Sequence, residues 1–222
     1  HDELEQNLLL NAVKAKVLNF GLAREPGEKQ FTFFPEMSGM SGSLSNAHND
    51  AKILKKMMMQ HLQTTRDTQK LENDLQNLAE RLFSKVKTCT CTLTTLSNMI
   101  QKETITKIDL LKIDVERAEL DVLNGIQQKD WRKLKQIVLE THTLPLKNII
   151  VELLERQGYD IFVETRKNDV LLENPNKYNY YTLAMIYAMQ HTKNTRVRKT
   201  TIIEKNIPQL SIGAIENHLN SV

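Results

Sequence analysis

The sequence predicts an α/β fold built on a largely parallel, doubly wound sheet. From Lys85 onward, short apolar runs alternate with segments of helical periodicity, and strands separated by single helices are typical of such a sheet. The chain has 222 residues, of which 40% are hydrophobic, and this is enough for one core. Ligands of these sheets bind outside the carboxyl ends of the strands, so functional side chains are expected there.

The elements of this sheet are expected to alternate along the chain. Strands are predicted at residues 86–93, 108–115, 134–142, 159–164 and 180–188, with helices at 95–102, 118–126 and 146–157. Gly125 and Gly158 close two of these helices, a position where glycine is common. These boundaries decide which residues stand at the strand ends.

The first 86 residues show a different pattern. A helix is expected at 3–12 and a short buried strand at 16–20, and the turn EPGEK precedes the β-prone run QFTFFP. A Ser/Gly-rich loop, SGMSGSLSNAHND, follows. Residues 47–86 then carry the periodic apolar positions of an amphipathic helical hairpin, which we interpret as a lid inserted into the domain.

Charge and hydropathy argue against two kinds of partner. The formal net charge is +3, with 30 Lys and Arg against 27 Asp and Glu, so no nucleic acid is expected to bind. No apolar run approaches the ~18–20 residues that span a bilayer, and the acidic start HDELEQ is unlike a signal peptide. The sequence therefore predicts a soluble, cytoplasmic protein without a membrane partner.

Three carboxylates and one imidazole stand at the ends of two predicted strands. Asp114 and Glu116 close one strand, and Glu140 and His142 close the next and share a face. A carboxylate beside an imidazole can orient it, so His142 is predicted to act as a general base near neutral pH. Glu140 is its expected orienter, and Asp114 completes the predicted catalytic set.

Other chemistries find little support in the motifs. The sequence contains no GxSxG, GxGxxG or GxxxxGK[ST] pattern, and its only close glycines are Gly39 and Gly42. Cys89 and Cys91 have no histidine at a metal-binding spacing, so they are expected to pack against one face of their strand. No metal site is predicted.

Segments spread along the chain resemble the FkbM family of S-adenosylmethionine-dependent methyltransferases, particularly the versions embedded in nonribosomal peptide and polyketide synthetases. The resemblance runs from about Leu4 to Tyr187. Its segments are LEQNLLLNA (4–12), NFGLA (19–23), FTFFPEMSGMSG (31–42), TLSNMI (95–100), IDLLKIDVERAELDVLNGI (108–126), DW (130–131), KQIVLETH (135–142) and LLERQGYDIFVE (153–164).

The resemblance implies a Rossmann-like class I methyltransferase sheet of order 3-2-1-4-5-7-6 with an inserted helical lid. It also implies S-adenosylmethionine as cofactor and methyl transfer, usually to a hydroxyl oxygen. Asp114 and Glu116 match the family's KIDVE-type strand end, and His142 matches the histidine that closes the next strand. Gly21 and Leu22 match the region expected beside the adenosine.

Two departures from the family pattern stand out. The family usually has glycine where this chain has Arg117, whose long cation would narrow or charge the mouth of the crevice. The first strand with its glycine-rich loop, and the acidic end of the second strand, have no counterpart in the sequence, so the sheet is expected to be incomplete at its N-terminus. Residue 1 is not Met, and the chain is therefore interpreted as a piece of a longer protein.

The expected domain organisation follows from these matches. Residues 1–190 are predicted to be a methyltransferase domain that lacks its first two strands, with the helical insertion at about 47–86. Residues 191–222 are predicted to be a linker and a short helix of a neighbouring region, because QLSIGAIENHLNSV (209–222) resembles a segment of adenylation domains. The 222 residues alone are expected to bind the cofactor weakly and not to hold their first 40 residues in the native position.

The sequence thus predicts O-methylation of a hydroxyl on a peptide or polyketide natural-product intermediate, either carrier-bound or free. Neighbouring synthetase domains are the expected partners. Three alternatives stay open: a noncatalytic, truncated methyltransferase-like spacer or interaction domain, a stand-alone sugar methyltransferase, and an N-methyltransferase of the same fold.

Overall fold

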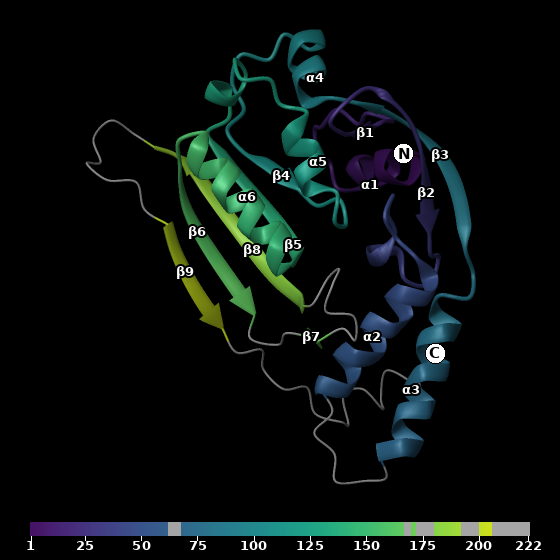
Figure 1. Ribbon diagram of the computed structural model, residues 1–222. Coiled ribbons are helices and arrows are strands. Elements are labelled where there is room, and N and C mark those ends of the chain that lie inside the picture. Colours follow the sequence, from purple (N-terminus) through teal and green to yellow (C-terminus); the bar gives the residue numbers. More distant parts are fainter. Residues whose placement is uncertain (62–67, 167–169, 172–179, 192–199, 206–222) are drawn as a thin grey trace.

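The computed structural model describes residues 1–61, 68–166, 170–171, 180–191 and 200–205, which include two separate β-sheets (Figure 1). The larger sheet has the order β4-β5-β8-β6-β9. Its strands are β4 (Leu111–Ile113), β5 (Gln136–Thr143), β6 (Tyr159–Arg166), β8 (Tyr180–Gln190) and β9 (Thr200–Lys205), and the short β7 (Val170–Leu171) pairs with β8.

The pairing of these strands confirms half of the expected order. Strand β4 runs parallel to β5, whereas β8 lies antiparallel between β5 and β6. The sequence β4-β5-β8-β6 is therefore the 4-5-7-6 half of the implied sheet. Among the described strands, β4, β5, β6 and β9 run in one direction and β8 runs against them, so the expectation of a largely parallel sheet is confirmed, with β8 as the exception.

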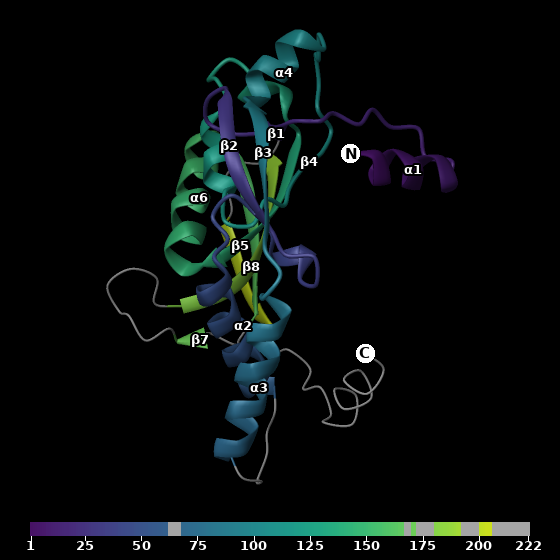
Figure 2. The same cartoon turned by 90° about the vertical axis from the view of Figure 1, so that its right-hand side faces the viewer.

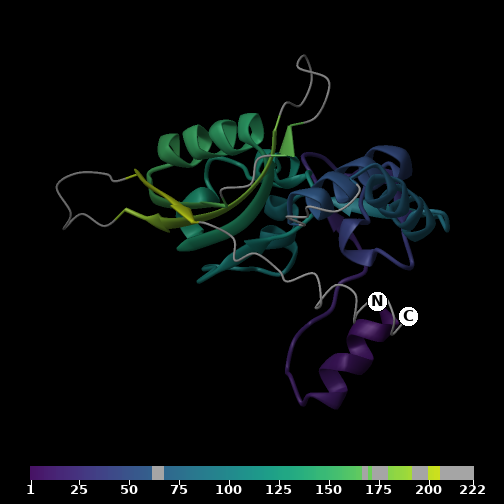
Figure 3. The ribbon, with the colours of Figure 1, turned by 90° about the horizontal axis from the view of Figure 1, so that it is seen from below.

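Helix α6 (Leu144–Arg156) covers one face of the larger sheet, against β5, β6 and β8 (Figures 1 and 3). Ile150 and Leu154 lie four residues apart on α6, so they share the face of the helix that is buried. Alternate residues of the strands complete this core, among them Ile137, Leu139, Ile161, Val163, Ala184 and Ile186. Each fully buried Ile or Leu stabilises the fold by ~1.5–3 kcal/mol, so burial on this face holds the sheet together.

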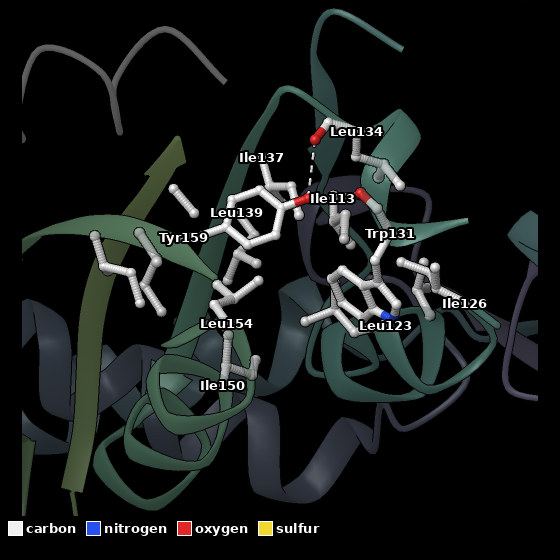
Figure 4. Close-up of a cluster of buried hydrophobic side chains, with 14 of the residues drawn as sticks. Ile113, Leu123, Ile126, Trp131, Leu134, Ile137, Leu139, Ile150, Leu154 and Tyr159 are labelled. Atoms are coloured by element: carbon white, nitrogen blue, oxygen red, sulfur yellow. Dashed lines mark hydrogen bonds between the residues drawn. The ribbon is translucent and has the colours of Figure 1, made fainter. Parts of the chain in front are cut away.

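The core also contains one buried phenol, which is fully hydrogen-bonded. The Tyr159 hydroxyl donates to the carbonyl oxygens of Leu134 at 2.9 Å and Trp131 at 3.2 Å (Figure 4). The Tyr159 and Trp131 rings meet edge to face, with centroids 6.2 Å apart. Burial raises the pKa of Tyr159 to about 12, so the phenol stays protonated and ties the start of β6 to the turn before β5.

Two short helices flank β4 in the chain. In α4 (Leu96–Lys102), the Thr95 side chain caps the first turn by accepting a hydrogen bond from the Asn98 amide at 3.0 Å. Helix α5 (Glu119–Asn124) ends at Gly125, where an added Cβ would lie 2.2 Å from the Ala23 carbonyl oxygen. Only glycine therefore lets the chain that follows β1 approach the end of α5 so closely.

The smaller sheet contains the strands before and after the helical hairpin. Its order is β1-β3-β2, from β1 (Gly21–Leu22), β2 (Gly27–Phe33) and β3 (Lys87–Thr94). The strand expected at 16–20 is wrong, because its apolar side chains are only partly buried and pairing with β3 begins at Gly21. The expectation that the strand near 86–93 belongs to the main sheet is also wrong, since it is the central strand of this separate one.

The expected N-terminal helix is present as α1 (Asp2–Leu10), but it packs on neither sheet. Figures 2 and 3 show it standing apart from the rest of the described chain. Leu9 and Leu10 are 83% and 82% exposed, and none of the residues of α1 is buried. The apolar stripe of this helix is therefore unpartnered among the residues that the structure describes.

The expected helical hairpin consists of α2 (Ala47–His61) and α3 (Thr68–Leu82). The two helices share a small core with the chain on either side of them, formed by Phe34, Ala51, Ala79 and Phe83. Phe34 and Phe83 meet edge to face at 4.8 Å. Since Phe34 precedes the hairpin and Phe83 follows it, this contact closes the insertion at its base.

Two further expectations are corrected at the edges of the fold. Residues 200–205, expected to be part of a linker, form β9 and pair parallel with β6, while the helix expected near 210–220 lies outside the described residues. Cys89 and Cys91 share a face of β3 with their sulfurs 3.8 Å apart, but Cys89 is exposed and Cys91 half-buried. The two thiols therefore do not pack into a core.

Candidate active site

The candidate site lies at the carboxyl ends of β4 and β5, which are parallel neighbours. Nε2 of His142 is 3.5 Å from Oε2 of Glu116 and 3.5 Å from Oε1 of Glu140. Glu116 comes from the turn after β4, whereas Glu140 and His142 belong to β5. The structure therefore brings together three of the side chains that the sequence places at strand ends.

The end of β5 sets the position of the imidazole. Thr141 pairs with Ala184 and Thr143 with Tyr181, so the register between β5 and β8 shifts here, and the extra residue of this bulge belongs to β8, opposite His142. Thr141 and His142 are both buried. Helix α6 begins directly afterwards, capped by the Thr143 side chain, which accepts from the Leu146 amide at 3.3 Å. The ring therefore lies in the interior just before the chain turns into the helix.

The buried imidazole is neutral at physiological pH. His142 is 3% exposed, and burial, with the positive charge of Arg117, lowers its pKa from 6.5 to about 4. The contacts with Glu116 and Glu140 are therefore contacts of an uncharged ring and not ion pairs. The expectation of a histidine that titrates near neutral pH is corrected, because burial outweighs the neighbouring negative charges.

Glu116 is the group of this cluster that titrates near neutrality. Burial, followed by the negative charges of Asp114 and Glu140, raises the pKa of Glu116 from 4.5 to about 7. Its side chain is 25% exposed, against 4% for that of His142, so it lies nearer the surface. A carboxylate with a pKa near 7 can both accept and release a proton at physiological pH.

The turn that carries Glu116 has a left-handed backbone. Glu116 has a φ of 47° and Arg117 a φ of 77°, both in the region that favours glycine. A residue other than glycine held there costs on the order of 1–3 kcal/mol. The positive φ at Arg117 gives a physical reason for the glycine that the resembled family usually has at this position.

The Arg117 guanidinium, expected to narrow or charge the mouth of the crevice, pairs instead with a carboxylate of α2. Its Nη1 lies 3.1 Å from Oδ1 of Asp50, a carboxylate with no exposed side-chain surface. The other Asp50 oxygen, Oδ2, accepts from the Asn46 amide at 2.7 Å, at the start of the helix. Ser45 is also within reach, with its Oγ 3.5 Å from Nη2. Sequence reasoning missed Asp50, which lies four residues after Asn46, one position beyond the acidic residue of a capping box.

The remaining predicted residues lie outside the His142 contacts. Asp114 is half-exposed and binds the Lys112 ammonium at 2.8 Å, which raises the pKa of that lysine. Gly21 and Leu22 form β1 in the smaller sheet. A Cβ at Gly21 would lie 2.7 Å from the Leu93 side chain, so this glycine serves a close packing contact. Leu22 packs against the main core.

The donor set at the end of β4 fits part of S-adenosylmethionine. The cofactor carries a positive sulfonium and an ammonium group, and the side chains of Asp114 and Glu116 offer carboxylates at this edge of the sheet. The residues present therefore fit the cationic end of the cofactor.

The strand order and the acidic strand ends define the class of this protein, a Rossmann-like methyltransferase domain. The chain belongs to the FkbM methyltransferase family, because the family model described as the methyltransferase FkbM domain matches residues 6–161. The expectation of a methyltransferase domain of this family is thereby confirmed.

Relatives with assigned names extend this result. The chain is 32% identical over 193 residues to the AMB antimetabolite synthetase AmbE of Pseudomonas aeruginosa, covering 83% of this chain and 9% of that protein. It is 28% identical to the 31-O-demethyl-FK506 methyltransferase FkbM of Streptomyces tacrolimicus and 30% identical to the methyltransferase sdnD of Sordaria araneosa. Each of these two matches covers 72% of this chain, which spans 60% and 61% of the two relatives.

Among solved structures, the chain is similar to M1.HpyAVI, with a TM-score of 0.27, 12% identity, and coverage of 55% of this chain and 68% of the other. The family assignment does not depend on this weak likeness. No helix in the described ranges has the length and apolarity that a membrane crossing requires.

Proposed function

We propose that this domain transfers the methyl group of S-adenosylmethionine to a hydroxyl oxygen of a peptide or polyketide natural-product intermediate, carrier-bound or free. The name of the Streptomyces relative describes an O-demethyl substrate, and the name of the Pseudomonas relative describes a synthetase. Both support an O-methyltransferase that works beside neighbouring synthetase domains in the cytoplasm.

Methyl transfer places two demands on the protein. The acceptor oxygen must be held in line with the methyl carbon, and one proton must leave that oxygen. When bound, S-adenosylmethionine supplies the electrophilic methyl carbon. We assign Asp114 to the ammonium of the cofactor, and the helices α2 and α3 to a lid that excludes water from the site.

The proton is taken up by the pair of Glu116 and His142. The observation that carries this proposal is the position of His142 Nε2, 3.5 Å from a carboxylate oxygen of Glu116 and 3.5 Å from one of Glu140. The neutral imidazole carries no charge that would repel the departing proton, and Glu116 provides an acceptor whose pKa of about 7 matches the operating pH. Glu140 orients the ring through the same nitrogen.

The test compares two histidine variants of the full-length protein. With a hydroxylated acceptor, His142→Ala is expected to lower kcat by ~10²–10⁴, while the affinity for S-adenosylmethionine barely changes. His48→Ala is the matched control, because His48 is an exposed histidine on α2. Turnover unchanged by His142→Ala would remove this residue from the mechanism.

A noncatalytic spacer or interaction domain is the second candidate, and one observation favours it. Helix α1 buries none of its residues, and the apolar side chains of the segment at 16–20 are only partly buried. The two candidates separate on the transfer of a radiolabelled methyl group. Absence of labelled product across free and carrier-bound hydroxyl acceptors, with the cofactor bound, would favour the spacer.

A further inference from the structure

The turn between β4 and α5 needs an outside partner to hold its shape. Two successive residues in it, Glu116 and Arg117, have left-handed backbones, and neither is a glycine. Such a backbone persists only where the surrounding structure determines it. The position of the Glu116 carboxylate depends on this turn, because the turn sets the direction in which the side chain leaves the backbone.

Glu119 supplies that partner from the first turn of α5. Its side chain is fully buried, and its Oε1 accepts a hydrogen bond from the backbone amide of Arg117 at 3.0 Å. Burial raises the pKa of Glu119, while the amides of Glu119 itself, Arg117 and Val115 lower it. One buried carboxylate therefore interacts with the Arg117 amide, inside the left-handed segment, and with backbone amides on either side of that segment.

Packing from the opposite side leaves the turn little room. A Cβ at Gly42 would lie 3.2 Å from the Cβ of Glu116, so the loop before α2 touches the site residue directly. The Arg117 guanidinium is held by Asp50. The side chain of Arg117 is thus anchored on one helix, and its backbone amide is bound by another.

We propose that Glu119 is a positioning residue, whose carboxylate holds the left-handed turn and so keeps the Glu116 carboxylate beside His142. The proposal rests on the proposed function, since it concerns the pair that takes up the proton. It differs from simple capping of α5 in one respect. A cap would influence the titration of Glu116 only through the charge of Glu119, which raises the pKa of Glu116.

The first test follows the Glu116 carboxyl by carbon-detected NMR in the full-length protein without ligand. Glu119→Ala is expected to move the Glu116 titration from near pH 7 toward the ordinary carboxyl range, because the released side chain becomes hydrated. Glu119→Gln is the matched control, because it removes the charge that itself raises the Glu116 pKa but keeps a side-chain oxygen that can accept from the Arg117 amide. Equal shifts of the Glu116 titration in Glu119→Ala and Glu119→Gln would overturn the proposal, as would no shift in Glu119→Ala, whatever the enzyme assay shows.

The second test asks whether glycine relieves the need for Glu119. Glu119→Ala is expected to lower kcat by about 10²-fold in the wild-type background, as a misplaced catalytic group does. Arg117→Gly adopts the left-handed conformation without strain, and Asp50→Asn made together with it leaves no buried charge unpaired, so Glu119→Ala should cost much less in this background. Equal losses in both backgrounds would contradict the proposal. If the single variant fails to fold, recovery of folding when Glu119→Ala is combined with Arg117→Gly and Asp50→Asn supports it, and failure of that triple variant contradicts it.

Discussion

The guanidinium of Arg117 lies 3.1 Å from the fully buried carboxylate of Asp50, and this ion pair joins the turn after β4 to the start of α2. The two residues are 67 positions apart in the chain. One belongs to the candidate site and the other to the helical hairpin. The pair therefore couples the hairpin to the site by a contact that is shielded from solvent.

Removing one partner of this buried pair should destabilise the protein strongly. Asp50→Ala leaves the Arg117 charge uncompensated and the Asn46 amide without its acceptor, with an expected loss of about 3–5 kcal/mol. Urea unfolding measures the change. Arg24→Ala breaks the exposed Arg24–Asp121 pair and should cost about 0–1 kcal/mol. Similar losses in both variants would show that burial of the Asp50 pair is unimportant.

The pH dependence of stability should reveal the buried carboxyl of Glu116. Its pKa rises from 4.5 to about 7 on folding, so the folded protein keeps a proton that the unfolded chain releases. Stability contributed by Glu116 therefore falls as pH rises through this interval, by up to about 3 kcal/mol before allowance for its partial exposure. Glu116→Gln is expected to be more stable than the wild type at pH 8, with the difference vanishing near pH 4.5.

His142 makes stability change with pH in the opposite direction, and the Glu116→Gln variant reveals this contribution. Its pKa falls from 6.5 to about 4 on folding, so its contribution to stability rises with pH across that range. In the wild type the contributions of Glu116 and His142 to stability change with pH in opposite directions. In Glu116→Gln only the contribution of His142 remains, and it rises with pH. Glu28→Gln removes an exposed glutamate and serves as control. Parallel stability curves for the wild type and Glu116→Gln would contradict the raised pKa.

Gly125 should tolerate no side chain. The Cβ of Gly125→Ala would lie 2.2 Å from the Ala23 carbonyl oxygen. The chain after β1 must then move away from the end of α5, which should lower the free energy of unfolding by a value on the order of 3 kcal/mol. Gly27→Ala is the matched control, because nothing lies within 4 Å of its added Cβ. Thermal unfolding of both variants distinguishes them. A Tm for Gly125→Ala equal to that of Gly27→Ala would mean that the contact between β1 and α5 yields easily.

Cofactor binding by these 222 residues is expected to be weak, because the sequence has no glycine-rich cofactor loop. Calorimetric titration with S-adenosylmethionine measures the affinity, and tight binding would contradict this expectation. Asp114→Asn should weaken the residual affinity by removing the carboxylate assigned to the ammonium. Asp109→Asn is the matched control, since it changes another exposed aspartate that pairs with a nearby lysine.

Local patterns in the sequence determined the helices, most strands of the larger sheet and the side chains at its carboxyl edge. Periodicity places Asp114 and Glu116 after one strand and Glu140 and His142 at the end of the next. Parallel neighbours end at the same edge, so these groups had to lie close together. The family motifs supplied the 4-5-7-6 strand order. The antiparallel direction of β8 could not be inferred from its apolar run alone.

Only the tertiary structure decided how the site residues behave. Packing around His142 buries the ring, and burial moves the group that titrates near neutral pH from His142 to Glu116. The Asp50–Arg117 pair, the β1–β3 pairing and the edge strand β9 likewise join segments far apart in the chain. Solvent exclusion and the distances between remote charges are set by the assembled fold, and no local pattern of residues encodes them.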